Sequence, residues 1–437
     1  MKAKLSQSQA SKYITGLVAN QAGEIFELEG FAAVGMANSA LAPLTLADTA
    51  SLPYGTELMF LPQRYPIFYN LETKQLQVLA ENPYVPGEAI YPVAAFNSPG
   101  YITTHTSAYE EGPTASLLPL FSYGAVGWFK GRFRSAVMRV DWERRQDLRL
   151  MPDEDVRAGI TRMRRRMPDN RLRAHLENCA LQYGCPAGKN FFLARYEAPL
   201  PTSNRCNARC LGCLSLQPDD AVHISQERIA FTPTPDEIAE IALTHLKQVA
   251  RGVVSFGQGC EGDPLLAAHV IEPAIRKIRS QTRRGTINLN TNASRPAILQ
   301  TLMDAGLDSM RVSLNSVRKP CYEAYFRPQG YTFENVLASI DLAIAQKCWV
   351  SINYLNCPGF TDAPEEAEAL TAFLQRYPIN MIQWRNLNFD PMHYWQTMAQ
   401  AGPLSPPLGM RSLLARVRKV FPALKHGYFN PPKEKWR

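Results

Sequence analysis

The chain contains 437 residues, 46% of them apolar and 10% aromatic, so it is long and apolar enough to bury the cores of two or three domains. This composition excludes a disordered or fibrous protein. No segment approaches the roughly 18 uninterrupted apolar residues of a transmembrane helix, and residues 1–21 are polar and lack the apolar centre of a signal peptide. We therefore expect a cytoplasmic protein that makes no contact with a membrane.

Residues 1–97 are expected to form a small β-rich domain. Short apolar runs at 24–31, 58–61 and 76–79 lie between Gly, Pro, Asn and Asp residues, a pattern that is typical of strands joined by turns. Residues 98–189 continue as a mixed connector that is rich in aromatic residues and Arg. Between 153 and 181 its apolar residues recur at helical spacing, which predicts that this part is helical.

The formal charge of +8 arises mostly at residues 130–173, where 14 basic residues stand against 7 acidic ones. Such a cluster could bind RNA or an acidic protein face. The alternative is a solvated helix face, because the acidic residues 153–155 offer partners within the helix. The basic residues that matter most to the first interpretation are Arg162, Arg164, Arg165 and Arg166.

From residue 190 onward, strand-like runs alternate with helical ones, which indicates βα units around a parallel sheet. Strands are expected at 191–198, 252–256, 286–290, 309–314, 349–355 and 381–387, and helices near 235–249, 264–281, 295–305, 333–346 and 363–376. The fold class is therefore α/β, a partial (β/α)6 TIM-like barrel over 190–390, preceded by the β-rich domain and the helical connector. Residues 391–437 form a C-terminal extension, whose amphipathic basic helix and final segment are expected to pack as a lid or brace.

Three of the nine cysteines, Cys206, Cys210 and Cys213, follow the first expected strand at C-x3-C-x2-C spacing. A [4Fe-4S] cube normally takes four Cys ligands, so three thiolates on one loop would leave one iron open to another ligand. Zinc is the alternative. It prefers four ligands, usually from paired C-x2-C segments, and no second pair exists here, although Cys185 could be recruited.

On this spacing and its position after a strand, residues 190–390 resemble the radical S-adenosylmethionine (radical SAM) superfamily. Gly212 departs from the pattern, because the family often has an aromatic residue before the last Cys. The resemblance implies a [4Fe-4S] cluster, S-adenosylmethionine (SAM) as cofactor, an electron donor of the flavodoxin or ferredoxin type, and a 5′-deoxyadenosyl radical that modifies a peptide, protein or RNA. The rival interpretation is a non-catalytic iron-sulfur or zinc protein that binds nucleic acid.

Six residues at later strand ends match segments that hold SAM in the family. Gly262 and Asp263 look like its G-G-E-P segment, with Asp263 in the Glu position facing the methionyl ammonium. The alternative for each position is a turn or a helix cap. The remaining four are Asn290 and Asn292, similar to a T-N-G stretch, and Ser313 and Asn315, similar to an S-x-D segment.

Four further cysteines are weaker candidates. Cys260 and Cys357 fall on loops at the expected mouth of the barrel and could give a hydrogen atom to a substrate radical, whereas most such thiols are inert and buried. Cys179 and Cys185 precede the barrel at C-x5-C spacing and could hold an auxiliary cluster. The histidines of the helical segments, among them His175, are assigned no role.

Overall fold

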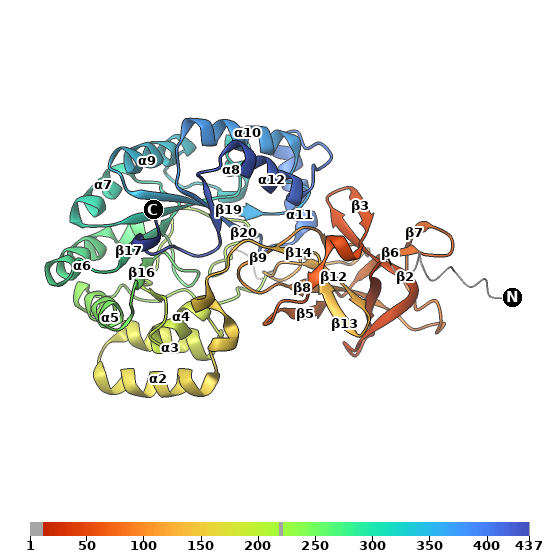
Figure 1. Ribbon diagram of the computed structural model, residues 1–437, viewed down its shortest axis with the longest axis horizontal. Coiled ribbons are helices and arrows are strands. Elements are labelled where there is room, and N and C mark those ends of the chain that lie inside the picture. Colours follow the sequence, from red (N-terminus) through yellow and green to blue (C-terminus); the bar gives the residue numbers. More distant parts are fainter. Residues whose placement is uncertain (1–11, 218–221, 437) are drawn as a thin grey trace. The chain divides into compact units, whose positions relative to one another are not determined.

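The computed structural model describes residues 12–217 and 222–436 (Figure 1). It divides into two compact units, of which the first combines Met1–Asp141, Leu355–Leu370 and Trp384–Pro422, and the second combines Trp142–Tyr354, Thr371–Gln383 and Ala423–Arg437. Residues 1–11 lie outside the described part. They include the start of the expected β-rich domain and half of the segment 1–21 that was compared with a signal peptide. Among the described helices, none combines the length and apolarity that crossing a bilayer requires.

The first unit is built around a 12-stranded antiparallel sheet, and the expected strands near 24–31, 58–61 and 76–79 are confirmed. Strands continue past the expected boundary at residue 97, because β12 pairs with β1 and β8. The strands of this sheet are β1 (Thr15–Ala19), β2 (Ile25–Ala37), β3 (Ala40–Pro43), β4 (Ala50–Ser51), β5 (Glu57–Phe60), β6 (Arg64–Asn70), β7 (Gln75–Val78), β8 (Tyr91–Phe96), β10 (Thr106–Ser107), β11 (Tyr109–Glu111), β12 (Gly124–Phe129) and β13 (Arg132–Ser135). A separate pair joins β9 (Tyr101–Thr103) to β14 (Val137–Arg139).

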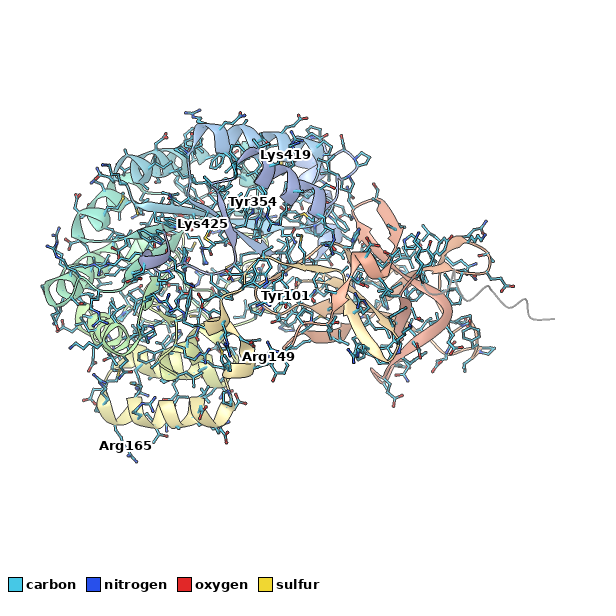
Figure 2. The ribbon with its side chains drawn as sticks, viewed as in Figure 1. Tyr101, Arg149, Arg165, Tyr354, Lys419 and Lys425 are labelled. Atoms are coloured by element: carbon cyan, nitrogen blue, oxygen red, sulfur yellow. The ribbon has the colours of Figure 1, made fainter. Side chains whose placement is uncertain are left out.

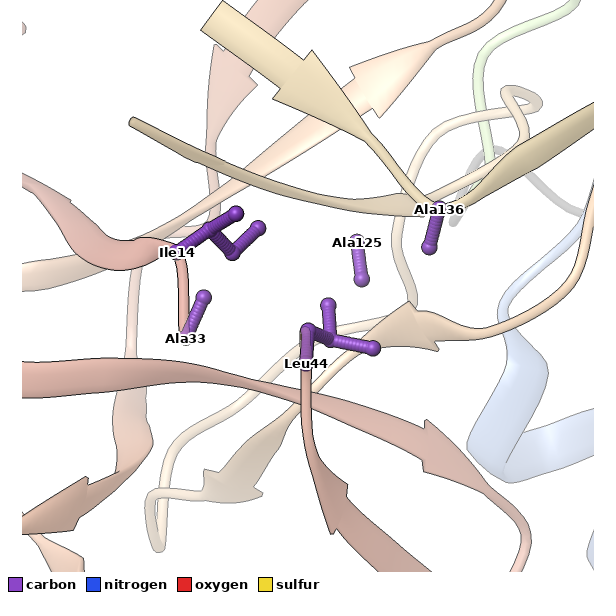
Figure 3. Close-up of a cluster of buried hydrophobic side chains, with 5 residues drawn as sticks. All are labelled: Ile14, Ala33, Leu44, Ala125 and Ala136. Carbon is purple, nitrogen blue, oxygen red and sulfur yellow. The ribbon is translucent and has the colours of Figure 1, made fainter. Parts of the chain in front are cut away.

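Small side chains fill the centre of this sheet. Ile14 and Leu44 pack against Ala33, Ala125 and Ala136, all buried (Figure 3). Alanine at three of the five positions lets strands that are far apart in the sequence approach closely, while the two larger residues supply most of the buried apolar area.

Two later helices complete the first unit, α11 (Pro391–Ala401) and α12 (Met410–Val420). Asp390 begins α11, because its carboxylate accepts hydrogen bonds from the Met392 and His393 amides. The other carboxylate oxygen lies 3.1 Å from Nη2 of Arg64, and both side chains are buried. This ion pair joins β6 to α11. The expected amphipathic helix of the C-terminal extension is confirmed as α12.

The second unit opens with the helical connector, which is confirmed over 153–181 as α2 (Asp153–Arg166) and α3 (Arg171–Leu181). The strand expected at 191–198 is wrong. Cys185 and Pro186 instead begin a short helix, α4 (Pro186–Phe192), in which Phe191 and Phe192 are buried, and the strand β15 is limited to Glu197–Pro199. A short apolar run does not distinguish a buried helix from a strand, and proline at the first helical position favours the helix.

A seven-stranded parallel sheet follows, in the order β15-β16-β17-β18-β19-β20-β21, and confirms the partial barrel. Its strands after β15 are β16 (Val253–Phe256), β17 (Thr286–Thr291), β18 (Ser309–Leu314), β19 (Trp349–Asn356), β20 (Met381–Asn386) and β21 (Lys425–Gly427). The helices between them are α5 (Pro235–Gln248), α6 (Ala268–Gln281), α7 (Pro296–Ala305), α8 (Lys319–Phe326), α9 (Phe333–Ala345) and α10 (Pro364–Arg376). Helices α5, α6, α7 and α9 lie along the outside of the curved sheet (Figure 1).

The sheet has one polar and one apolar face, because successive side chains of a strand point to opposite sides. On β17, Ile287 and Leu289 are fully buried apolar residues, whereas Asn288 donates to Asn290 Oδ1 at 2.8 Å and accepts from Ser309 at 2.7 Å. The C-terminal segment supplies Asn430 to this polar face. It donates to Glu197 at 2.9 Å and accepts from Gln383 at 2.9 Å, so the segment acts as a brace.

Candidate functional site

The three-cysteine loop, residues 200–217, leaves the end of β15 and is held by the backbone that ends α8. Arg209 donates its amide to Phe326 O at 2.9 Å, Leu211 donates to Tyr325 O at 3.0 Å, and Gln329 donates to Asn207 O at 2.8 Å. Helix α8 was not among the expected helices. Backbone pairing of this kind fixes the path of the loop without using the cysteine side chains.

The three thiols are partly buried. Burial and the charge of Asp263 raise the pKa of Cys206 to about 11, and burial together with the neighbouring cysteines raises the pKa of Cys210 well above its usual value. These two ligand thiols must lose their protons when a metal binds. Beside the third, Arg228 Nη2 lies 3.5 Å from the Cys213 sulfur and can donate a hydrogen bond to it.

The donor set of the loop fits an iron-sulfur cluster. Three thiols at C-x3-C-x2-C spacing on one loop can bind three irons of a [4Fe-4S] cube and leave the fourth iron to another ligand. A structural zinc site usually takes four protein ligands.

Glu261 joins the three-cysteine loop to the loop that follows β16. Its Oε2 accepts from the Thr202 amide at 2.7 Å and the Ser203 amide at 2.9 Å, while its Oε1 accepts from the Gly257 and Gln258 amides, both at 2.7 Å. Burial raises the pKa of Glu261 to about 7, against the lowering effect of these amides. A single carboxylate therefore holds two loop ends together.

Two glycines permit the close approach of these loops. Gly257 has φ +78°, and a Cβ there would lie 1.7 Å from Asn290 O. A Cβ at Gly262 would lie 1.8 Å from Arg205 O, and the Gly262 amide donates to Ser203 O at 2.6 Å. Any larger residue at Gly262 would push the loop that precedes Cys206 away.

Asp263 is 5% exposed and accepts internal hydrogen bonds on both oxygens. The Leu265 amide donates to Oδ1 at 3.0 Å, the Asn292 amide donates to Oδ2 at 2.7 Å, and the Thr291 hydroxyl lies 2.9 Å from Oδ1. Burial raises the pKa of Asp263, and these donors oppose the rise. The carboxylate thus joins the ends of β16 and β17, as well as beginning the turn at Pro264.

The asparagines expected at the cofactor extend this network. Asn292 donates to Asn207 Oδ1 at 2.8 Å, and Asn207 donates to Ser294 Oγ at 2.9 Å, so the loop after β17 is tied to the three-cysteine loop. Asn290 donates to Gly257 O at 2.9 Å. The structure therefore brings four of the expected residues, Gly262, Asp263, Asn290 and Asn292, into one network around the cysteines.

The last two expected cofactor residues lie on and after β18. Asn315 is fully buried and donates to Cys321 O at 3.1 Å, so it holds the start of α8. Ser313 is partly exposed and pairs with Asn353 across the β18–β19 ladder. Tyr322 of α8 packs on Phe326, with ring centroids 4.5 Å apart.

The two expected hydrogen-atom donors belong to different units. Cys260 is buried in the second unit, where its sulfur lies 3.4 Å from Nε2 of His175 on α3. Cys357 is buried in the first unit beside Pro358, and burial raises its pKa well above the usual value.

Sequence reasoning missed Glu261, Asn207 and Arg228. Glu261 directly precedes the expected cofactor residue Gly262, Asn207 lies inside the C-x3-C-x2-C spacing, and Arg228 lies between the three-cysteine loop and α5. Their roles depend on partners elsewhere in the chain, and for that reason the local pattern alone does not reveal them.

Part of the chain is similar to known proteins. Residues 200–371 match the family model of the Radical SAM superfamily. A curated relative, Molybdenum cofactor biosynthesis protein 1 of Drosophila melanogaster, is 27% identical over 143 residues, which is 32% of this chain and 23% of the relative.

Solved structures with similar folds include native anSMEcpe with bound AdoMet, at 17% identity and TM-score 0.34, covering 44% of this chain and 52% of that one. Another is the FeFe-hydrogenase maturase HydG of Carboxydothermus hydrogenoformans, at 15% identity and TM-score 0.36, covering 62% of this chain and 70% of that one. The chain thus spans about half of the first of these structures and less than a quarter of the curated relative.

Proposed function

We propose that the chain is a radical SAM enzyme, which cleaves SAM reductively at a [4Fe-4S] cluster held by Cys206, Cys210 and Cys213. Residues 200–371, less than half of the chain, match the family model of this superfamily. The observation that carries the proposal is the three-cysteine loop itself. Its path is fixed by α8 and by Glu261, and its three cysteines follow one another at C-x3-C-x2-C spacing.

A [4Fe-4S] cluster held by Cys206, Cys210 and Cys213 would supply one electron for the reductive cleavage of SAM, the chemistry that gives methionine and a 5′-deoxyadenosyl radical able to remove a hydrogen atom from a substrate. Three protein thiolates would leave one iron of the cube open to SAM. Arg228 lies beside this loop, with Nη2 3.5 Å from the Cys213 sulfur.

For the cofactor, we assign Asp263 and Asn292 to the side that faces the methionyl group, and Asn290, Ser313 and Asn315 to the polar strand ends beyond it. Support comes from the network that joins Asp263 and Asn292 to the three-cysteine loop. In this arrangement Asp263 acts partly by positioning, since both of its oxygens already accept hydrogen bonds within the protein.

The electron donor in this proposal is a flavodoxin or ferredoxin, as other radical SAM enzymes use. Cys260 and Cys357 stay candidates for returning a hydrogen atom to a substrate radical. Both are buried, so a substrate would have to displace the residues that cover them.

Of the two substrate classes that the sequence leaves open, we propose a peptide or protein rather than RNA. Much of the Arg-rich connector is occupied by internal contacts. Arg164 forms an ion pair with Glu177, and Arg162 donates to Phe192 O at 3.1 Å. Arg165, by contrast, is exposed and projects from α2 (Figure 2). This leaves fewer cations for phosphate contacts than the count of basic residues suggests.

The experiment is reductive cleavage of SAM by the full chain after anaerobic reconstitution with iron and sulfide. With dithionite as reductant, methionine and 5′-deoxyadenosine should form in equal amounts. Cys210→Ala should lose the cluster's visible absorption and the reaction, whereas Cys348→Ala, which removes a thiol on the approach to β19, should retain both. An iron-replete protein that leaves SAM intact would refute the proposed function.

A further inference from the structure

A second set of metal-ligating side chains lies outside the three-cysteine loop. Nε2 of His175 lies 3.4 Å from the Cys260 sulfur and 3.5 Å from the Cys179 sulfur, and all three ligand atoms are within 4.8 Å of one another. His175 and Cys179 are one turn apart on α3, while Cys260 comes from the loop after β16. Two cysteines and a histidine from separate segments therefore converge on one point.

These distances match the edges of a tetrahedral zinc site. With Zn–S bonds of about 2.3 Å and Zn–N bonds of about 2.0–2.1 Å, a sulfur and a nitrogen on one ion lie about 3.6 Å apart. The observed edges are 3.4 and 3.5 Å. Hydrogen bonding alone accounts for the arrangement less well, because one imidazole nitrogen holds either one proton or one lone pair and here contacts two sulfurs.

We propose that His175, Cys179 and Cys260 bind a single zinc ion, with Cys185 as the fourth ligand. Thiolate and imidazole ligands are those that zinc prefers, and convergence on one point suits one ion rather than the auxiliary cluster considered for Cys179 and Cys185. When zinc binds, the thiol protons are released to solvent, and no electron is transferred.

The backbone holds Cys185 beside Cys179, which makes it the candidate for the fourth position. Its amide donates to Cys179 O at 3.0 Å, and it begins α4, which packs beside α3. An ion could enter from solvent through a cavity of about 320 Å³ that His175 lines together with Arg171, Asn178 and Phe231.

Such an ion would fasten the connector to the barrel. Cys260 directly precedes Glu261, whose carboxylate holds the three-cysteine loop, so a zinc ion on Cys260 would fix that carboxylate relative to α3. This inference goes beyond the proposed function and does not depend on it, because the zinc ligands and the three cysteines of the loop are separate sets.

The test is zinc binding by the full chain in which Cys206, Cys210 and Cys213 are replaced by Ala, so that the loop cannot take up metal. We expect one zinc per chain by elemental analysis. In competition with a chromophoric chelator, His175→Ala, Cys179→Ala or Cys260→Ala should each lower the zinc affinity by at least about 100-fold, and Cys185→Ala should lower it less. Cys348→Ala is the matched control and should leave the zinc affinity unchanged.

A second measurement uses the unaltered cysteines and does not require any variant to fold. Added zinc should protect Cys179, Cys185 and Cys260 from alkylation, as mapped by mass spectrometry, and cobalt in place of zinc should give thiolate charge-transfer absorption. Zinc binding that survives loss of His175, or a Cys179–Cys260 disulfide in the anaerobically purified protein, would overturn the proposal. SAM cleavage is not a readout, so its failure would leave this result unaffected.

Discussion

Glu261→Gln is the substitution that tests most directly how the site is held. At pH 8 the carboxyl is ionised, since its pKa lies at about 7, and each oxygen accepts two backbone amides. A glutamine has the same shape but offers an NH2 group in place of one oxygen. That group would face two amide donors, either those of Thr202 and Ser203 or those of Gly257 and Gln258.

The cost follows from the number of donors left without an acceptor. Each buried N–H that loses its acceptor costs about 1–3 kcal/mol, so two of them should lower the free energy of local opening by about 2–6 kcal/mol. Hydrogen exchange followed by mass spectrometry over 200–205 and 257–263 measures this opening directly. Global unfolding is a poorer measure, because the chain contains two compact units that need not unfold together.

A surface carboxylate provides the control. Glu272→Gln removes an ion pair with Arg276 on the exposed side of α6, and it should change local opening by less than about 1 kcal/mol. If exchange at both loop segments is the same in Glu261→Gln as in the unaltered protein, the four amides do not depend on this carboxylate, and the account of the site given above is wrong.

Three further predictions concern the cofactor, the pH dependence and RNA. Asp263→Ala should weaken SAM binding by about 10- to 100-fold in equilibrium titrations and leave the iron content unchanged, since a charge-assisted contact contributes roughly 1.5–3 kcal/mol. An unchanged SAM affinity would mean that the carboxylate only begins the turn. Burial lowers the pKa of His245 from 6.5 to about 4. As the pH falls from 6.5 to 4, the unfolded chain therefore takes up a proton on this histidine and the folded chain does not. The free energy of unfolding should drop by up to about 3 kcal/mol over that range. His245→Gln should lack this part of the pH dependence and the exposed His269→Gln should keep it, as measured by denaturant unfolding. RNA binding at low salt should be weak or absent, and any binding found should lose affinity and salt slope when Gln replaces Arg162, Arg164, Arg165 and Arg166.

Local pattern was enough for much of the parallel sheet. The strand expected at 309–314 coincides with β18, and those expected at 286–290 and 349–355 differ from β17 and β19 by one residue at the end. Most residues of these strands are buried, so the sheet itself largely dictates their residue types. The cysteine spacing was enough to indicate the three-cysteine loop as the candidate cluster site, because closely spaced thiolates can bind adjacent irons of one cube.

Partners that are far apart in the sequence set the limit of such reasoning. No local pattern shows that β21 would add a seventh strand beside β20, since Lys425–Gly427 is short and polar. The same holds for His175, which was given no role because its ligand partner Cys260 is 85 residues away. In both cases the tertiary fold, and not the neighbouring residues, creates the contact.

Buried polar residues nevertheless narrow the search, because each needs a hydrogen-bond partner. The alternation on β17 places Asn288 and Asn290 on one buried face, and a face of that kind requires further polar groups to cover it. The chain meets this requirement with Asn430, from the segment that follows β21, which bonds Glu197 on β15 and Gln383 on β20. Sequence therefore indicates that a polar cover must exist, and only the fold determines which residue provides it.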